Sequence, residues 1–203
     1  MDVPPPSVET LLPFPASIHP LRAARSTILV GSIAVIRESG RFDAYRALLP
    51  KEFHGALFEA IAGTWTPAEA AVAHYKTCDL LDFSPEEQVA NGRRTFDRTG
   101  AVFFGTMMRM AKGAGVTPWT FLPHLQRFYE RGYDGGGVAV FRAGPKESQI
   151  VLVESGICES RYYRAALRGL LGAMVEMFCS KAYLVELRPP RGPSSMSVRV
   201  QWA

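Results

Sequence analysis

The chain has 203 residues, of which 47% are hydrophobic and 21% charged, and its formal net charge at pH 7 is +4. These values are typical of a globular protein that buries a sizeable core, and the small, scattered positive charge argues against a nucleic-acid-binding domain. Prolines interrupt the apolar residues near the N-terminus, and no apolar run approaches the ~20 residues of a membrane-spanning helix. We therefore expect a cytoplasmic protein without a secretory signal or a membrane span. Its three cysteines have no CxxC spacing, which indicates reduced thiols.

The chain is expected to consist of an N-terminal arm and a single domain. Residues 1–22 are rich in proline and lack periodicity, so we expect an extended arm that is mobile or lies over the surface. The domain should occupy residues 23–203. Its first segment, STILVGSIAVI at 26–36, combines β-branched residues with a helical face, and we expect a short strand that passes into a helix.

Residues 42–131 carry helical patterns and are expected to form a helical lobe. The segments TPAE, beginning at Thr66, and SPEE, beginning at Ser84, each predict a capping box with proline in the first helical turn. The helix that begins after Ser84 should run to about Lys112. Another helix should begin at Thr117-Pro118, and Pro123 should bend it or end it.

Residues 134–202 are expected to form a sheet lobe. The runs GGGVAVFRAG and SQIVLVESG flank a turn at 145–147, and the runs KAYLVELRPP and SSMSVRVQW flank a second turn at 191–193. Between these two hairpins, the apolar face of segment 160–178 predicts a helix that covers a four-stranded antiparallel sheet. The fold class is therefore α+β, with a helical N-terminal half followed by a β-β-α-β-β unit.

The helix predicted at 160–178 has two further features. Gly169 and Gly172 should allow its backbone to approach a neighbouring helix closely. Arg161, Arg164 and Arg168 lie on the side opposite the apolar face. We interpret them as a solvated basic stripe, and contact with an anionic partner or ligand headgroup is the alternative.

These segments carry a family resemblance. SRYYRAALRGLLGAMVEMF, preceded by GGVAVF and IVLVES and followed by AYLVEL and MSVRVQW, resembles the C-terminal half of the superfamily that unites four-vinyl-reductase domains with haem nitric-oxide/oxygen-binding domains. Residues 25–202 also resemble an uncharacterised paralogous family abundant in myxobacteria, through segments such as DAYRALLP, GTWTPAEAAVAHYKTCDLL and AKGAGVTPW. The resemblance implies a cytosolic, often dimeric module that encloses a small hydrophobic ligand or cofactor.

We accordingly expect a ligand-binding sensory or adaptor module. Its mainly hydrophobic ligand would bias the packing of the helical half against the sheet, and a homodimer or a signalling partner protein would report the occupancy. A ligand-free dimerisation scaffold is the alternative function. The volume of any internal cavity should distinguish the two, because a filled core favours the scaffold and an enclosed void favours the sensor.

A haem-based gas sensor is a lesser alternative, because the resemblance is incomplete. Haem-binding relatives have a Tyr-x-Ser-x-Arg motif before the helix, and the matching stretch here, GICES, lacks it. Their axial histidine comes from the helix before the first hairpin, where His124 lies about one turn too early. The cysteines implicated in metal binding by four-vinyl-reductase domains are also missing, since Ser160 takes the first position and RPPRGPSSM contains none.

His74 and Cys78 form a weak candidate zinc site. They lie four residues apart on one helical face, with Asp82 one turn further along. A stable zinc site needs at least three protein ligands, so a buried structural pair is the favoured interpretation. No catalytic set or nucleotide-binding motif occurs, and no catalytic residue is predicted. An enzyme that uses His74 with Cys78, or Tyr162 with Tyr163, ranks last among the functions.

Methionine and aromatic residues gather between positions 103 and 128, where they can fill a core or line a cavity for an apolar ligand. If a cavity exists, we expect seven side chains to contribute to it: Phe103, Met107, Arg109, Trp119, His124, Phe128 and Tyr129. Arg109 or Tyr129 would supply the polarity.

Overall fold

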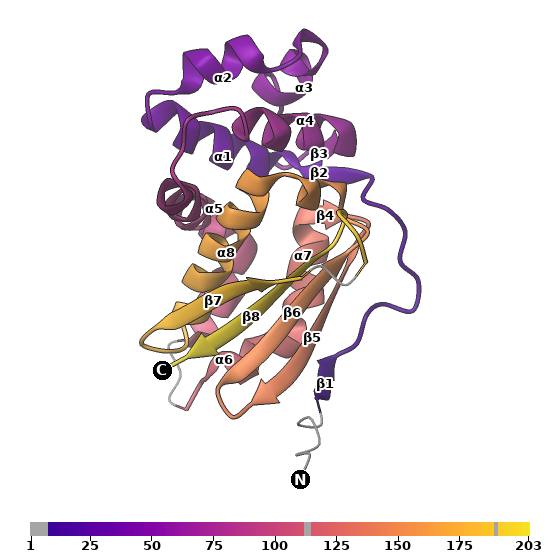
Figure 1. The fold of residues 1–203 in the computed structure, drawn as a ribbon, viewed down its shortest axis with the longest axis vertical. Coiled ribbons are helices and arrows are strands. Elements are labelled where there is room, and N and C mark those ends of the chain that lie inside the picture. The colour runs from indigo at the N-terminus through magenta and orange to yellow at the C-terminus, as the bar shows by residue number, and fades with distance from the viewer. Residues whose placement is uncertain (1–7, 112–114, 189–190) are drawn as a thin grey trace.

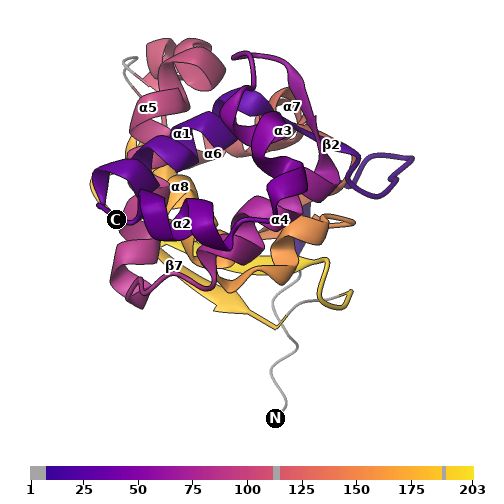
Figure 2. The ribbon, with the colours of Figure 1, turned by 90° about the horizontal axis from the view of Figure 1, so that it is seen from above.

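The helices of the N-terminal half lie at one end of an antiparallel sheet (Figure 1). The computed structural model describes residues 8–111, 115–188 and 191–203, without the side chains of 101–111. The helical elements of this half are α1 (Ser26–Glu38), α2 (Phe42–Leu48), η1 (Lys51–Phe53), α3 (His54–Phe58), α4 (Ala68–Cys78) and α5 (Pro85–Ala111). Seen from above, α1 to α4 lie over the sheet end of the molecule (Figure 2).

The sheet has five antiparallel strands in the order β1-β5-β6-β8-β7. Their bounds are β1 (Glu9–Leu12), β5 (Gly137–Gly144), β6 (Glu147–Val153), β7 (Ala182–Leu187) and β8 (Met196–Trp202). The hairpins β5–β6 and β7–β8 meet at the centre, where β6 pairs with β8. Helix α8 (Arg161–Glu176) follows the short turn η3 (Gly156–Glu159) and covers the sheet. The predicted α+β class and both predicted hairpins are confirmed.

Two features of the strands were not expected. The sheet gains a fifth strand because β1, within the proline-rich segment, pairs with β5. A separate three-stranded sheet, in the order β3-β2-β4, joins the two halves of the chain. Its strands are β2 (Ala23–Arg25), β3 (Trp65–Pro67) and β4 (Tyr133–Asp134).

The connection between the large helices and the sheet is made by α6 (Pro118–Phe121), η2 (Leu122–His124) and α7 (Leu125–Gly132). Thr117 caps α6 through a capping box with Thr120, as its position before Pro118 indicates. Pro123 lies in η2, so the helix breaks there instead of continuing with a bend. Among the described residues, no helix is both long and apolar enough to span a membrane.

Two sequence-based predictions of local structure are wrong. Residues 26–36 are helical throughout, because Leu29, Ile33 and Ile36 are buried at helical spacing, and only Ala23–Arg25 before them form a strand. No capping box forms at Thr66, which is buried and pairs with Ala24 in the small sheet. The capping box at Ser84 is confirmed, since Ser84 and Glu87 exchange their backbone-to-side-chain hydrogen bonds.

Helices α5 and α8 cross in direct backbone contact, and two glycines make this contact possible. A Cβ atom at Gly169 would lie 1.9 Å from the carbonyl oxygen of Val89, and one at Gly92 would lie 1.8 Å from that of Ala166. Any side chain at either position would therefore separate the helices. The close approach predicted for Gly169 is confirmed.

The arginines of α8 do not form a uniformly solvated stripe. Arg161 is exposed, but Arg164 is half-buried and forms an ion pair with Glu186 of β7. The Arg164 guanidinium also donates to the carbonyl oxygens of Cys158 and Ser195. A charged side chain fixed by three acceptors holds α8 to the end of the sheet, which corrects the solvated interpretation for this residue.

Candidate ligand-binding site

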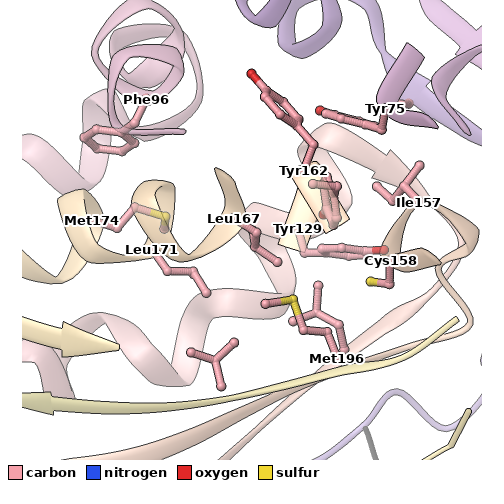
Figure 3. Close-up of a cluster of buried hydrophobic side chains, with 14 of the residues drawn as sticks. Tyr75, Phe96, Tyr129, Ile157, Cys158, Tyr162, Leu167, Leu171, Met174 and Met196 are labelled. Carbon is pink, nitrogen blue, oxygen red and sulfur yellow. The ribbon is translucent and has the colours of Figure 1, made fainter. Parts of the chain in front are cut away.

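An apolar cavity of about 70 Å³ lies where the helices face the sheet. Helix α7 contributes Leu125, Phe128, Tyr129 and Gly132, and α8 contributes Tyr163, Leu167, Leu170, Leu171 and Met174. The remaining lining residues come from two helices of the N-terminal half and from strands β4, β5 and β6: Ile28, Thr99, Tyr133, Val138, Ile150 and Leu152. Figure 3 shows Leu167 and Leu171 directed from α8 toward the sheet, with the ring of Tyr129 on the same side of the helix.

The periodicity of each element places these side chains in the cavity. The contributing residues of α7 and α8 recur at three- and four-residue intervals, so each helix presents one face. Ile150 and Leu152 are two apart on β6, and side chains two apart on a strand point to the same face. The cavity therefore lies between one face of the sheet and the facing sides of α7 and α8.

Tyrosine hydroxyls supply most of the polarity around the cavity. A smaller void of about 30 Å³ adjoins it, and both voids are lined by Tyr133, Tyr163 and Leu167. The ring of Tyr75, which lines the smaller void, lies 4.8 Å from that of Tyr163. Burial raises the pKa of Tyr133 to about 12 and those of Tyr75 and Tyr163 well above the ordinary value. These hydroxyls are therefore protonated at neutral pH.

The structure brings together only part of the predicted cavity lining. Phe128 and Tyr129 are among the residues that line it. Trp119 does not, because its indole N–H donates to the carbonyl oxygen of Pro145 at 2.9 Å and its ring packs against Trp202. His124 is exposed on the turn before α7 and does not line the cavity. The side chains of Phe103, Met107 and Arg109 lie outside the described residues.

Sequence reasoning missed the contribution of Tyr163. The apolar spacing of α8 predicts Leu167, Leu171 and Met174 on a buried face, but Tyr162 and Tyr163 are adjacent and only one of them can share it. In the structure Tyr163 lines the cavity, and Tyr162 points away from the sheet toward the helical half (Figure 3). Counting four residues back from Leu167 would have identified Tyr163.

His74 and Cys78 belong to a buried polar network and not to a metal site. His74 Nδ1 lies 2.7 Å from the Tyr45 hydroxyl, and Nε2 lies 3.0 Å from Ser32 Oγ. Burial lowers the pKa of His74 to about 3, so both imidazole nitrogens serve hydrogen bonds of a neutral ring. The described residues include no third histidine, cysteine or carboxylate near enough to complete a metal site.

The same burial makes Cys78 a poor nucleophile. Its Sγ lies 4.0 Å from His74 Nε2, but burial raises the pKa of the thiol well above its usual range. A thiol that stays protonated is a poor nucleophile, and a zinc ion would lack a third ligand among the described residues. The residues present therefore do not fit zinc or Cys–His catalysis.

No protein-family model matches the sequence, and no curated protein matches it. Solved structures do. An Fe(II) unliganded H-NOX protein from K. algicida superposes with a TM-score of 0.64 at 9% identity, covering 88% of this chain and 96% of that one. A mutant H-NOX protein from T. tengcongensis gives 0.56 at 12% identity, covering 88% of this chain and 97% of that one. The chain has the H-NOX fold. A structure from a study of haem distortion in the H-NOX family agrees, with a TM-score of 0.56 at 13% identity and coverage of 88% and 94%. The predicted relation to haem nitric-oxide/oxygen-binding domains is confirmed for the fold.

The described residues of this H-NOX fold do not fit haem. A haem iron needs an axial donor, most often an imidazole or a thiolate, and the described cavity lining contains neither. The Tyr129 hydroxyl is directed at Ser155 Oγ, 3.5 Å away, and no arginine or lysine lies in the described lining to pair with a propionate, since Arg164 is held by Glu186. The volume of about 70 Å³ is also well below the ~300–1,000 Å³ of cofactor pockets. The lining fits a molecule of a few atoms.

Proposed function

We propose that the protein is a sensory ligand-binding module, and that a small, mainly hydrophobic molecule occupies the cavity between α7, α8 and the sheet. The observation that carries this proposal is the apolar void itself. At ~24 cal/mol per Å³, a void of about 70 Å³ costs about 1.7 kcal/mol of stability when nothing fills it. A ligand that fills it recovers part of this energy, and binding therefore stabilises the conformation that contains the void.

The signal would be a shift between packing arrangements of the helical half against the sheet. Ile28 and Thr99 reach the cavity from the helical half, whereas Val138 and Ile150 reach it from the sheet. A ligand in the cavity would therefore contact both the helical half and the sheet. In this proposal a homodimer or a partner protein in the cytoplasm reads the change.

Xenon tests the proposal, because it binds apolar cavities through dispersion alone. Under xenon pressure, the backbone amide signals of Val138, Leu167 and Leu171 should shift in a saturable manner. The Val138→Ile variant narrows the cavity and should weaken this response, whereas Val140→Ile, on the same face of the same strand but outside the cavity, should keep it. The proposal fails if xenon shifts no cavity signal in the wild-type protein.

A second candidate function, the ligand-free scaffold, is supported by a groove on the outside of the helical half. Apolar residues of α2 and α4 line it, and Leu48 and Leu80 at its rim are 46% and 67% exposed. Exposed apolar surface of this kind is typical of protein contacts, and a second copy of the chain is the simplest occupant. Sedimentation equilibrium should then show a dimer that dissociates in Leu48→Glu or Leu80→Glu. A monomeric wild-type protein would exclude this scaffold.

A further inference from the structure

The hydroxyl of Tyr163 is a buried polar group left without a hydrogen bond. Tyr163 lies in the first turn of α8, is 3% exposed, and lines both the larger and the smaller void. Its hydroxyl makes no hydrogen bond to any described residue. By contrast, the Tyr129 hydroxyl donates to Ser155 Oγ. Because buried polar groups are normally paired, an unpaired hydroxyl on a cavity wall indicates a partner that is not part of the chain.

The surroundings of this hydroxyl restrict what that partner can be. The hydroxyl of Tyr133 is the polar group that acts most strongly on Tyr163, and the contact between the two hydroxyls falls outside the distances and angles of a regular hydrogen bond. No charged side chain is among the described residues that line either void. A charged ligand would be buried without a counter-ion at high cost, so the ligand is neutral. Protonated tyrosines offer O–H donors, so the ligand carries an acceptor.

The size of the cavity sets the size of the ligand. An apolar cavity of about 150 Å³ holds one benzene molecule of six carbon atoms. The cavity here is about 70 Å³, with a neighbouring void of about 30 Å³ beyond the shared wall. By proportion the larger cavity alone holds about three non-hydrogen atoms, and the two voids together hold about four, most of them apolar.

We infer that this site takes a compact neutral molecule with an apolar body and one hydrogen-bond acceptor, such as a short ketone, aldehyde, ether or nitrile, and that the Tyr163 hydroxyl donates to that acceptor. The inference rests on the proposed function, since it names the ligand class of the same cavity. Tyr163 is then the residue that sets specificity, and the leucine side chains supply the affinity common to all apolar ligands.

Acetone and isobutene form a matched pair of probes, because they have the same shape and four non-hydrogen atoms each, and only acetone carries an acceptor. Both are titrated into the ¹⁵N-labelled full chain and followed by NMR. In Tyr163→Phe the affinity for acetone relative to isobutene should fall by about fivefold to tenfold, the value of one hydrogen bond. The affinity for isobutene should remain unchanged. Because the hydroxyl has no partner, the variant should melt at or above the wild-type temperature.

Tyr162→Phe is the matched control, since Tyr162 is equally buried on the same turn but does not line either void. It should leave the affinity ratio unchanged. An equal ratio in the wild-type protein and Tyr163→Phe, with isobutene and xenon still bound, would overturn the role of Tyr163 and leave the cavity proposal standing. Absence of binding by xenon, isobutene and acetone alike would overturn both.

Discussion

Replacing Val138 by isoleucine should stabilise the protein, although the position is almost fully buried. Val138 is 2% exposed on β5 and lines the cavity. The added methylene group would enter the void of about 70 Å³ instead of displacing neighbouring atoms. Burial of one methylene group is worth ~0.8 kcal/mol. This is below the ~1.7 kcal/mol that the whole void costs, so one added group fills only part of it.

Thermal unfolding measures this gain. For a chain of this length, each kcal/mol shifts the melting temperature by ~2–4 °C, so the rise for Val138→Ile should be about 2–3 °C. Urea unfolding should show a higher midpoint with an unchanged slope, since the same surface becomes exposed.

The same substitution at Val140 provides the control. Val140 is fully buried two residues along the strand, on the same face, and does not line the cavity. Overfilling a packed site costs ~1–3 kcal/mol, so Val140→Ile should lower the melting temperature. Equal destabilisation by the two substitutions would refute the void and with it the reasoning for a ligand site.

Three further predictions concern other parts of the structure. Gly169→Ala should destabilise the protein by ~3 kcal/mol in urea unfolding, because its Cβ would overlap the carbonyl oxygen of Val89. Gly55→Ala in α3 is the control: no atom lies within 4 Å of the new Cβ, so it should stabilise the protein by ~0.5–1 kcal/mol. As the pH is lowered from 6.5 to 3, His74 should reduce the free energy of unfolding by ~1.4 kcal/mol per pH unit. The reason is that the imidazole of the unfolded chain takes up a proton near pH 6.5, whereas the buried imidazole does so only at about pH 3. His74→Gln should remove this component of the slope. Arg164→Met should cost ~2 kcal/mol, because it leaves a half-buried carboxylate without its ion-pair partner.

Each of these three has an outcome that would contradict it. Similar effects of the alanines at Gly169 and Gly55 would exclude a tight crossing of α5 and α8. Parallel pH profiles of the wild-type protein and His74→Gln would mean that the imidazole is accessible to protons in the folded state. A loss within the range of surface ion pairs, ~0–1 kcal/mol, would mean that Arg164 is solvated.

The local signals of the sequence predicted most of the fold. The capping box at Ser84 and both hairpins depend on residues close together in the chain, and they form as predicted. The capping box at Thr66 fails because Ala24, more than forty residues earlier, pairs with Thr66 in a strand. The added strand β1 has the same origin, since its pairing with β5 bridges most of the chain.

The cavity was predictable only in part, because its lining depends on the phase of each helix. Pro123 places a 3-10 turn between α6 and α7, so the face of α7 cannot be extrapolated from Trp119. This is why Phe128 and Tyr129 line the cavity, whereas His124 and Trp119 do not. An unpaired hydroxyl such as that of Tyr163 leaves no trace in composition or spacing, because it depends on which partners the fold fails to provide.

The crossing of α5 and α8 limits how the two halves can move. Helix α5 belongs to the helical half and α8 to the sheet half, and at Gly92 and Gly169 they meet without intervening side chains. Because this contact is between backbone atoms, a change of side-chain rotamers cannot alter the distance between the two helices there. Rotation about the contact point costs least, because the backbone distance there stays constant while the distant ends swing. The glycine pair would thus act as the pivot of any relative rotation of α5 and α8.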